Sequence, residues 1–337
     1  TDARFADLER WAGRLDAVVA AFPEDREIRL HEAMAAVNAI NRYGEVGVKT
    51  DARFADLERW AGRLDAVVAA FPEDREIRLH EAMAAVNAIN RYGEVGVKTD
   101  ARFADLERWA GRLDAVAASS RKDIQIRRRE AHAAFNAIKA YGKAGQANDA
   151  RFADLERWAR RLASVAADFP EAHDILLGEA MAAVNAINSY GEAGLKNDAR
   201  YADLERWAGR LDSMAANFPQ DRDFQLHEAI AAIYAMKSYG EAGRENGARF
   251  ADLERWAGRL DAVVAAFPED RDIRLHEAKA AVNAISGYGK AGRNADRARW
   301  LVRLGVVADA FPYDLEIQQL ATRYAAALPR RSPPGLS

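Results

Sequence analysis

Apolar residues recur every three or four positions along most of the chain, which is the spacing of one buried stripe on an α-helix. One such helix is expected over residues 51–70. Its apolar stripe, which continues to the next residue, comprises Phe54, Leu57, Ala61, Leu64, Val68 and Phe71. A second helix is expected over residues 73–92, where the stretch from Ala82 to Ile89 is apolar almost all round. A helix of that kind packs on more than one side. The pattern predicts an all-α protein.

Several residues mark the expected helix ends. Thr50 lies at the expected N-cap position of the helix over residues 51–70. The equivalent positions later in the chain are occupied by Asn148, Asn197 and Asn246. Phe71-Pro72 ends the first helix, because proline cannot continue the backbone hydrogen bonds. Pro72 also suits the first position of the next helix, with Asp74 at the positive N-terminal end. Gly93 or Gly96 is expected to end that helix in the left-handed conformation. So short a link predicts two antiparallel helices.

This two-helix pattern repeats every 49 residues, and residues 1–49 are identical to residues 50–98. The repeats span 1–49, 50–98, 99–147, 148–196, 197–245, 246–294 and 295–328. One hairpin cannot bury both faces of its second helix, so neighbouring hairpins must stack. We therefore expect a single array over 1–328, a right-handed α-solenoid of about seven antiparallel helix hairpins. Residues 329–337, rich in Pro, Arg and Ser, are expected to be a disordered tail.

Each repeat contributes one tryptophan in its first helix and, in the six complete repeats, one tyrosine near the end of its second. We call these the Trp helix (residues 51–70 in the second repeat) and the Tyr helix (residues 73–92). The tryptophans are Trp11, Trp60, Trp109, Trp158, Trp207, Trp256 and Trp300. Because an indole buries a large area, they are expected to form the core between repeats rather than a binding feature. The alanines at Ala82 and Ala85 and the tyrosine at Tyr92 do not change in the complete repeats.

The stretch from Ala36 to Tyr43, closed by Gly47, resembles the first helix of a tetratricopeptide repeat, a family that commonly has two asparagines spaced as Asn38 and Asn41 are. The family's closing proline matches Pro23, Pro72, Pro170, Pro219, Pro268 and Pro312. The repeat is longer than the family's about 34 residues, which lengthening both helices by about two turns explains. Trp60 and Leu64 stand where the family has Ala and Phe, and HEAT-type hairpins are an alternative. The resemblance implies a superhelix whose inner surface, lined by the Tyr helices, binds proteins or peptides.

One face of the Tyr helix differs between repeats, as expected of positions that contact either solvent or a ligand. Spacings of four and seven residues place the variable positions on that face. The residues predicted to contact a peptide there, outside the third repeat, are Met34, Asn41, Met83, Asn90, Met181, Asn188, Tyr234, Lys237 and Lys279. The methionines are suited to adaptable apolar contacts. The same variation is also expected of a solvated face that drifts without selection.

The third repeat has ten basic and six acidic residues, a net charge of +4, whereas the first has seven and nine, a net charge of −2. Arg128, His132, Lys139 and Lys143 share the variable face and form a predicted cation strip. An acidic peptide or a C-terminal carboxylate is its natural ligand. The repeat also has Ser120-Arg121 in place of Phe-Pro. The alternative is therefore a divergent repeat with a loosened helix break.

Composition narrows the function classes. The chain of 337 residues has 49 basic and 52 acidic residues, and this balance disfavours nucleic-acid and membrane-surface binding. It has no cysteine, which excludes disulfides and thiolate metal sites and is compatible with the cytoplasmic location that we expect. No run of about 18 apolar residues predicts a membrane span.

No motif for catalysis, a cofactor or a metal stands out. His31, His80, His227 and His276 each precede a glutamate at an expected surface edge, without the second histidine of a zinc-protease helix. The carboxylates are spread one set per repeat, as on solvated helix faces. We therefore expect no enzyme but a protein-interaction scaffold. One alternative function is self-assembly through the uncapped N-terminal helix, where Phe5, Leu8 and Trp11 have no preceding hairpin to bury them. A second alternative is modular RNA binding.

Overall fold

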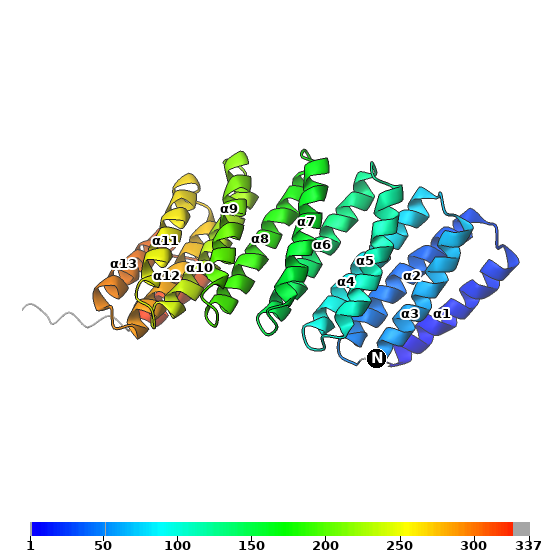
Figure 1. The fold of residues 1–337 in the computed structure, drawn as a ribbon, viewed down its shortest axis with the longest axis horizontal. Helices are drawn as coiled ribbons and strands as arrows, with labels where there is room; N and C mark the ends of the chain where they lie inside the picture. The colour runs from blue at the N-terminus through cyan, green and yellow to red at the C-terminus, as the bar shows by residue number, and fades with distance from the viewer. Residues whose placement is uncertain (1, 51, 326–337) are drawn as a thin grey trace, which may run out of the picture. The chain divides into compact units, whose positions relative to one another are not determined.

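The computed structural model describes residues 2–50 and 52–325, and these form fourteen α-helices joined by short turns, with no strand among them. The helices are α1 (Asp2–Ala21), α2 (Arg26–Gly47), α3 (Arg53–Ala70), α4 (Arg75–Gly96), α5 (Arg102–Ser119), α6 (Ile124–Gly145), α7 (Arg151–Asp168), α8 (His173–Gly194), α9 (Arg200–Asn217), α10 (Arg222–Ala242), α11 (Arg249–Ala266), α12 (Arg271–Lys290), α13 (Asn294–Ala310) and α14 (Leu315–Ala325). Figure 1 shows them in chain order. The chain is an all-α helical repeat protein, as predicted.

The chain divides into two compact units, Thr1–Glu179 and Ala180–Ser337. The odd-numbered helices are the Trp helices, and the even-numbered helices up to α12 are the Tyr helices. In the first unit α2 and α4 each pack on the next Tyr helix, and α2, α4 and α6 each pack on the Trp helix that follows (Figure 1). The contact of each with the Trp helix that precedes it is smaller. The second unit repeats this arrangement from α10 to α13. Helix α14 ends at Ala325, and the tail expected over residues 329–337 lies outside the described residues.

The predicted stripe of the Trp helix is buried and forms the core between repeats. In α3 the buried residues are Phe54, Leu57, Trp60, Ala61, Leu64 and Val67. Val67 thus occupies the position predicted for Val68, which is only half-buried. Trp60 is 2% exposed, and Phe54 stacks on Tyr92 with ring centroids 4.5 Å apart. The prediction that the tryptophans form core is confirmed for the six from Trp60 onward.

The Tyr helix begins two residues later than predicted, with an aspartate rather than a proline at its start. Asp74 is the N-cap of α4, and its carboxylate accepts the backbone N–H groups of Glu76 and Ile77 at 2.9 and 3.1 Å. Pro72 lies in the turn before it. In the third repeat, α5 ends at Ser119 and Asp123 caps α6 in the same way. The helix break therefore persists without Phe-Pro, and the expectation that it had loosened is wrong.

The predicted N-cap role of Thr50 is also wrong. The residue before α3 is Ala52, which makes no side-chain capping bond, and the Thr50 hydroxyl donates to the Val46 carbonyl at 3.3 Å. The asparagines that replace it accept the backbone N–H two residues on, as Asn148 does from Ala150 at 3.3 Å. These side chains shape the turn that precedes the Trp helix.

The glycines near the end of the Tyr helix permit close packing and do not take the left-handed conformation. Among the described residues only Gly292 has a positive φ, 72°. A Cβ on Gly96 would lie 2.9 Å from ring carbons of Phe103, and one on Gly93 would lie 2.9 Å from the Cβ of Ala140. Both glycines lie within α4, which extends to Gly96. The prediction that they cap the helix is wrong, because they make room for the next Trp and Tyr helices.

Candidate binding surface

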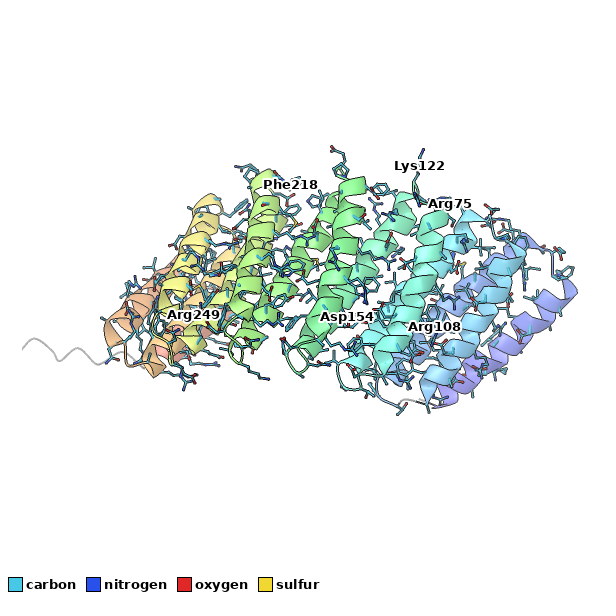
Figure 2. The ribbon with its side chains drawn as sticks, viewed as in Figure 1. Arg75, Arg108, Lys122, Asp154, Phe218 and Arg249 are labelled. Carbon is cyan, nitrogen blue, oxygen red and sulfur yellow. The ribbon has the colours of Figure 1, made fainter. Side chains whose placement is uncertain are left out.

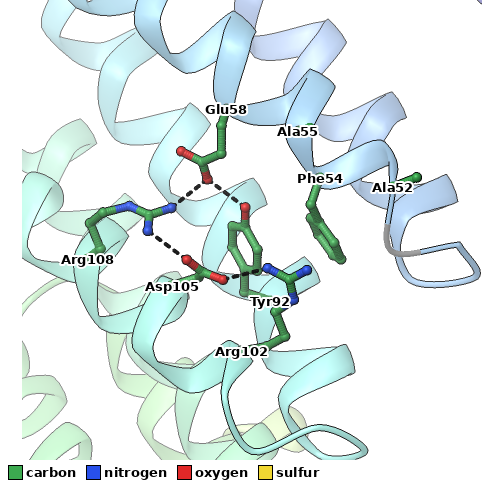
Figure 3. Close-up of a pocket in the computed structure, with 8 residues that line it drawn as sticks. All are labelled: Ala52, Phe54, Ala55, Glu58, Tyr92, Arg102, Asp105 and Arg108. Atoms are coloured by element: carbon green, nitrogen blue, oxygen red, sulfur yellow. Dashed lines mark hydrogen bonds and ion pairs between the residues drawn. The ribbon is translucent and has the colours of Figure 1, made fainter.

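A half-buried carboxylate joins consecutive repeats through three donors. Glu58 accepts hydrogen bonds from the Tyr92 hydroxyl at 2.5 Å, the Arg108 guanidinium at 2.7 Å and the Trp109 indole N–H at 3.1 Å. We call these four residues the glutamate node (Figure 3 shows three of them). Burial, with the hydrogen bond to Glu58, raises the pKa of Tyr92 well above its usual value, so the hydroxyl remains a donor. The same three donors meet at Glu107, Glu205 and Glu254.

The node borders a cavity of about 450 Å³, drawn in Figure 3. Its lining residues are Ala52, Phe54, Ala55, Glu58, Tyr92, Arg102, Asp105 and Arg108. Arg102 and Arg108 both bind Asp105, at 2.9 and 2.6 Å. The charges in this cavity therefore neutralise one another, and the cavity belongs to the contact between repeats.

A second carboxylate, on the Tyr helix, is buried between charged partners. Glu130 is 5% exposed and pairs with Arg127 at 2.5 Å and with Arg161 at 2.9 Å. Arg161 also lies over the ring of Trp158, 4.8 Å from its centroid. In the second repeat, burial raises the pKa of the corresponding Glu81. The prediction that these carboxylates lie on solvated faces is wrong for Glu81 and Glu130, because both are buried and each accepts from an arginine of its own helix.

Four histidines at equivalent positions of the Tyr helices lie against the backbone. In His31 and His80 the Nδ1 atom lies 2.7 and 2.8 Å from the carbonyl oxygen four residues earlier. His227 and His276 do the same at 2.6 Å. No group of three or more metal-ligating side chains occurs within residues 2–50 and 52–325.

The cation strip lies on α6, and three of its four members are exposed. Arg128 is half-buried and pairs with Asp174 at 2.8 Å, whereas His132, Lys139 and Lys143 are exposed. Desolvation of its ring, together with the positive charge of Arg129, lowers the pKa of His132. Neither lysine forms an ion pair with any residue in the described part of the chain. Two cations without carboxylate partners therefore lie four residues apart on one helix face.

The other predicted contact residues are distributed over both compact units. Met34 and Met181 are exposed by 42% and 36%, and Met83, Asn188 and Tyr234 are half-buried. Several of the polar ones already have protein partners. These pairs are Asn41 with Glu45 and Arg91, Asn90 with Glu94, Lys237 with Glu192 at 2.6 Å, and Lys279 with Glu316 at 2.8 Å. The predicted cations of the fifth and sixth repeats are thus neutralised, and those of α6 are not.

An arginine ladder links the starts of successive Tyr helices, and the sequence patterns considered above did not reveal it. Four Tyr helices, α2, α4, α10 and α12, begin with an arginine that binds the aspartate before the next even-numbered helix. The pairs are Arg26 with Asp74 at 2.5 Å, Arg75 with Asp123 at 2.5 Å, Arg222 with Asp270 at 2.5 Å and Arg271 with Asp314 at 2.6 Å. Figure 2 shows Arg75 at this end of the first compact unit, near Lys122.

The ladder is interrupted after α6, where Ile124 and Ala172 replace the arginine and the aspartate. A groove of about 610 Å³ occupies this place and is lined by Ile124, Arg128 and residues 168–174. We call it the third-repeat groove. A comparison of the repeats would have revealed it, because four of the six full-length Tyr helices begin with arginine and α6 begins with isoleucine.

No known family model, curated protein or solved structure matches this chain at a significant level. Within the described residues, no helix combines the length and apolar character needed to cross a membrane.

Proposed function

We propose that this chain is a non-catalytic protein-binding module of tetratricopeptide-like build, which holds an acidic peptide segment against α6. The observation that carries the proposal is the state of Lys139 and Lys143, which are exposed and have no ion pair within the described part of the chain. Lys237 and Lys279, on the equivalent face, have glutamate partners. Unpaired cations form charge-assisted hydrogen bonds with the carboxylates of a ligand without first breaking an existing pair.

The packing of the first compact unit supports the Tyr helices as the binding layer. Neighbouring Tyr helices approach at the backbone, as Gly93 and Ala140 do. Neighbouring Trp helices meet through long side chains, such as Arg112 with Asp65 and Arg63 with Asp16. In a curved array the more closely spaced layer lies on the inside, and solenoid proteins bind ligands on their extended concave surfaces. The methionines Met34 and Met83 add adaptable apolar contacts on this face.

The proposal assigns no catalytic step to the chain. In the cavity of Figure 3, each guanidinium is bound by a carboxylate, and the raised pKa of Tyr92 keeps its hydroxyl protonated. Groups in these states are poorly suited to act as a general base or a nucleophile at neutral pH.

Selection from a random peptide library tests the proposal. The unchanged chain serves as bait, and the double variant Lys139→Asn, Lys143→Glu serves as the matched control, since α4 has Asn90 and Glu94 at these positions. We expect the selected peptides to be rich in Asp and Glu, to lose binding to the variant, and to bind more weakly as salt rises. Peptides that bind both chains equally would contradict the proposal.

A second candidate function, self-association, rests on α1. The first two repeats are identical, yet Trp11 is 59% exposed and Trp60 is 2% exposed, because α2 covers α3 and no described helix covers α1 in this way. Phe22, directly after this helix, is 58% exposed. If α1 pairs with a second copy, the mass measured by light scattering rises with concentration, and Trp11→Glu prevents the rise. A constant monomer mass at every concentration would rule this candidate out.

A further inference from the structure

The third-repeat groove is the space that an arginine fills elsewhere in the array. In the second repeat, the Arg75 guanidinium reaches Asp123 and closes the gap between the starts of two Tyr helices. At the next position Ile124 is too short to do this, and Ala172 has no carboxylate to receive a guanidinium. The groove is therefore the result of two substitutions at paired positions of the ladder.

The floor of the groove is apolar and its rim is charged. Ile124, Phe169, Pro170 and Ala172 supply the apolar surface, and Asp168 is engaged by Arg127 at 2.8 Å. Glu171 and Asp174 lie on the rim, the latter paired with Arg128. An apolar side chain fits this floor, and a carboxylate close to the rim would be repelled by Glu171, since Asp168 and Asp174 are already paired with arginines.

The groove continues into the cation strip along one face of α6. At about 100° per residue, Ile124, Arg128, Phe135, Lys139 and Lys143 fall within an arc of about 100°. Phe135 is half-buried where the second repeat has Val86, which is 5% exposed. The stripe therefore runs from an apolar groove, past an aromatic ring, to two unpaired lysines. Its middle and far end have no acidic member.

Resting on the proposed function, we propose that the partner segment runs along α6, with a bulky apolar residue in the third-repeat groove and a pair of carboxylates on Lys139 and Lys143. The helical rise places Lys139 about 16 Å and Lys143 about 22 Å from Arg128 along the axis. An extended chain covers that distance in about five to seven residues. The segment has a neutral or basic flank beside the apolar residue, because Glu171 is a rim carboxylate without an arginine partner in the described part of the chain.

Synthetic fluorescent peptides test this partner. Each peptide carries one tryptophan and two glutamates in a Gly/Ser background, with a spacing shorter than, equal to or longer than about six residues. Fluorescence anisotropy measures their affinity for the unchanged chain. We expect the intermediate spacing to bind at least about tenfold more tightly than the others, and Trp→Gly in the peptide to remove that advantage.

A chain variant tests the groove itself. The substitutions Ile124→Arg and Ala172→Asp restore the ladder as α4 and α6 have it, so they fill the groove and add an N-cap to α8. We expect about tenfold weaker binding of the best peptide with an unchanged or higher melting temperature. The inference would be overturned if binding required Lys139 and Lys143 but did not depend on the spacing, on the tryptophan or on the groove substitutions. That result would leave the proposed function standing. If no acidic peptide binds at all, both are overturned.

Discussion

The glutamate node and the cation strip differ in whether their charged side chains have partners within the protein. At the node, Glu58 gathers a hydroxyl, an indole N–H and a guanidinium from two repeats, and every donor has its acceptor. On α6, Lys139 and Lys143 face solvent with no ion pair in the described part of the chain. The comparison teaches that the paired charges of this array hold its repeats together, and that the unpaired charges are free to bind a ligand.

Breaking the node should have the largest effect on stability. Glu58→Ala leaves the Tyr92 hydroxyl and the buried Trp109 N–H without their acceptor, and we expect the free energy of unfolding to fall by about 2–4 kcal/mol. Denaturant unfolding measures it. Glu73→Ala, at an exposed position of the same repeat, is the control and should change stability by less than about 0.5 kcal/mol. Equal losses in the two variants would contradict the node's role.

A pH effect is expected at Glu228 of α10, a buried Tyr-helix carboxylate that lacks an arginine partner present at Glu277. Glu277 pairs with Arg274 at 2.9 Å, but Glu228 has Gln225 at that position, and Gln225 donates to the Ala215 carbonyl instead. Burial raises the pKa of Glu228 to about 7, against the opposing charge of Arg259 and with the added repulsion of Asp212. One carboxylate oxygen of Glu228 is buried without a hydrogen bond.

The sign of the pH effect follows from that raised pKa. Between the ordinary value of 4.5 and about 7, folded Glu228 keeps a proton that the unfolded chain releases. Its contribution is complete below pH 4.5 and is lost as the pH rises through 7, by up to about 3 kcal/mol. Unfolding of the unchanged chain and of Gln225→Arg, measured across this range, isolates the effect. We expect a flatter pH dependence in the variant, and parallel curves would refute the assignment.

Glycine substitutions distinguish close packing from helix propensity. Gly96→Ala pushes a methyl group against the Phe103 ring, so we expect a loss of about 1–3 kcal/mol. At Gly62 nothing lies within 4 Å of the added Cβ, and alanine is the better helix former there. Gly62→Ala should therefore gain about 0.5–1 kcal/mol. Thermal unfolding of both variants checks the prediction, which fails if the two changes have the same sign.

The smallest effect on stability is expected on the cation strip. Lys139→Asn with Lys143→Glu gives α6 the residues of α4 and removes no ion pair of the described chain. We expect the free energy of unfolding to change by less than about 0.5 kcal/mol. Differential scanning calorimetry measures this. A loss comparable to that of Glu58→Ala would show that the strip is structural.

The helices, their amphipathic stripes and the burial of the tryptophans were predictable because each depends on local spacing. The repeat also revealed which positions stack, since Ala82, Ala85 and Tyr92 recur and are buried. The cation strip was predicted as a set of positions on one helix face. Whether a lysine has a partner was not predictable, because Lys139 and Lys237 look alike in sequence and both have a glutamate at the equivalent position of the preceding Tyr helix. Glu94 is bound by Arg91, whereas Glu192 has Ser189 at that position and pairs with Lys237.

The errors arose where a residue serves the neighbouring repeat rather than its own helix. Gly96 has the position of a helix cap but provides room for Phe103. Glu58 has the spacing of a solvated charge, yet its three donors come from a Tyr helix of the same repeat and a Trp helix of the next. Ile124 looked unremarkable until the ladder showed what an arginine does at that position. The node and the ladder depend on contacts between residues far apart in the chain, as in Arg108 with Glu58, 50 residues apart, and Arg75 with Asp123, 48 residues apart.

A charge-swap titration tests the central claim, binding of carboxylates by the unpaired lysines of α6, most directly. An acidic peptide from the selection, and the same peptide with its glutamates changed to lysine, are titrated calorimetrically into the unchanged chain and into Lys139→Glu, Lys143→Glu. The account predicts that each chain binds only the peptide of opposite charge, with a coupling that weakens as salt rises. Equal binding of the acidic peptide to both chains would contradict it.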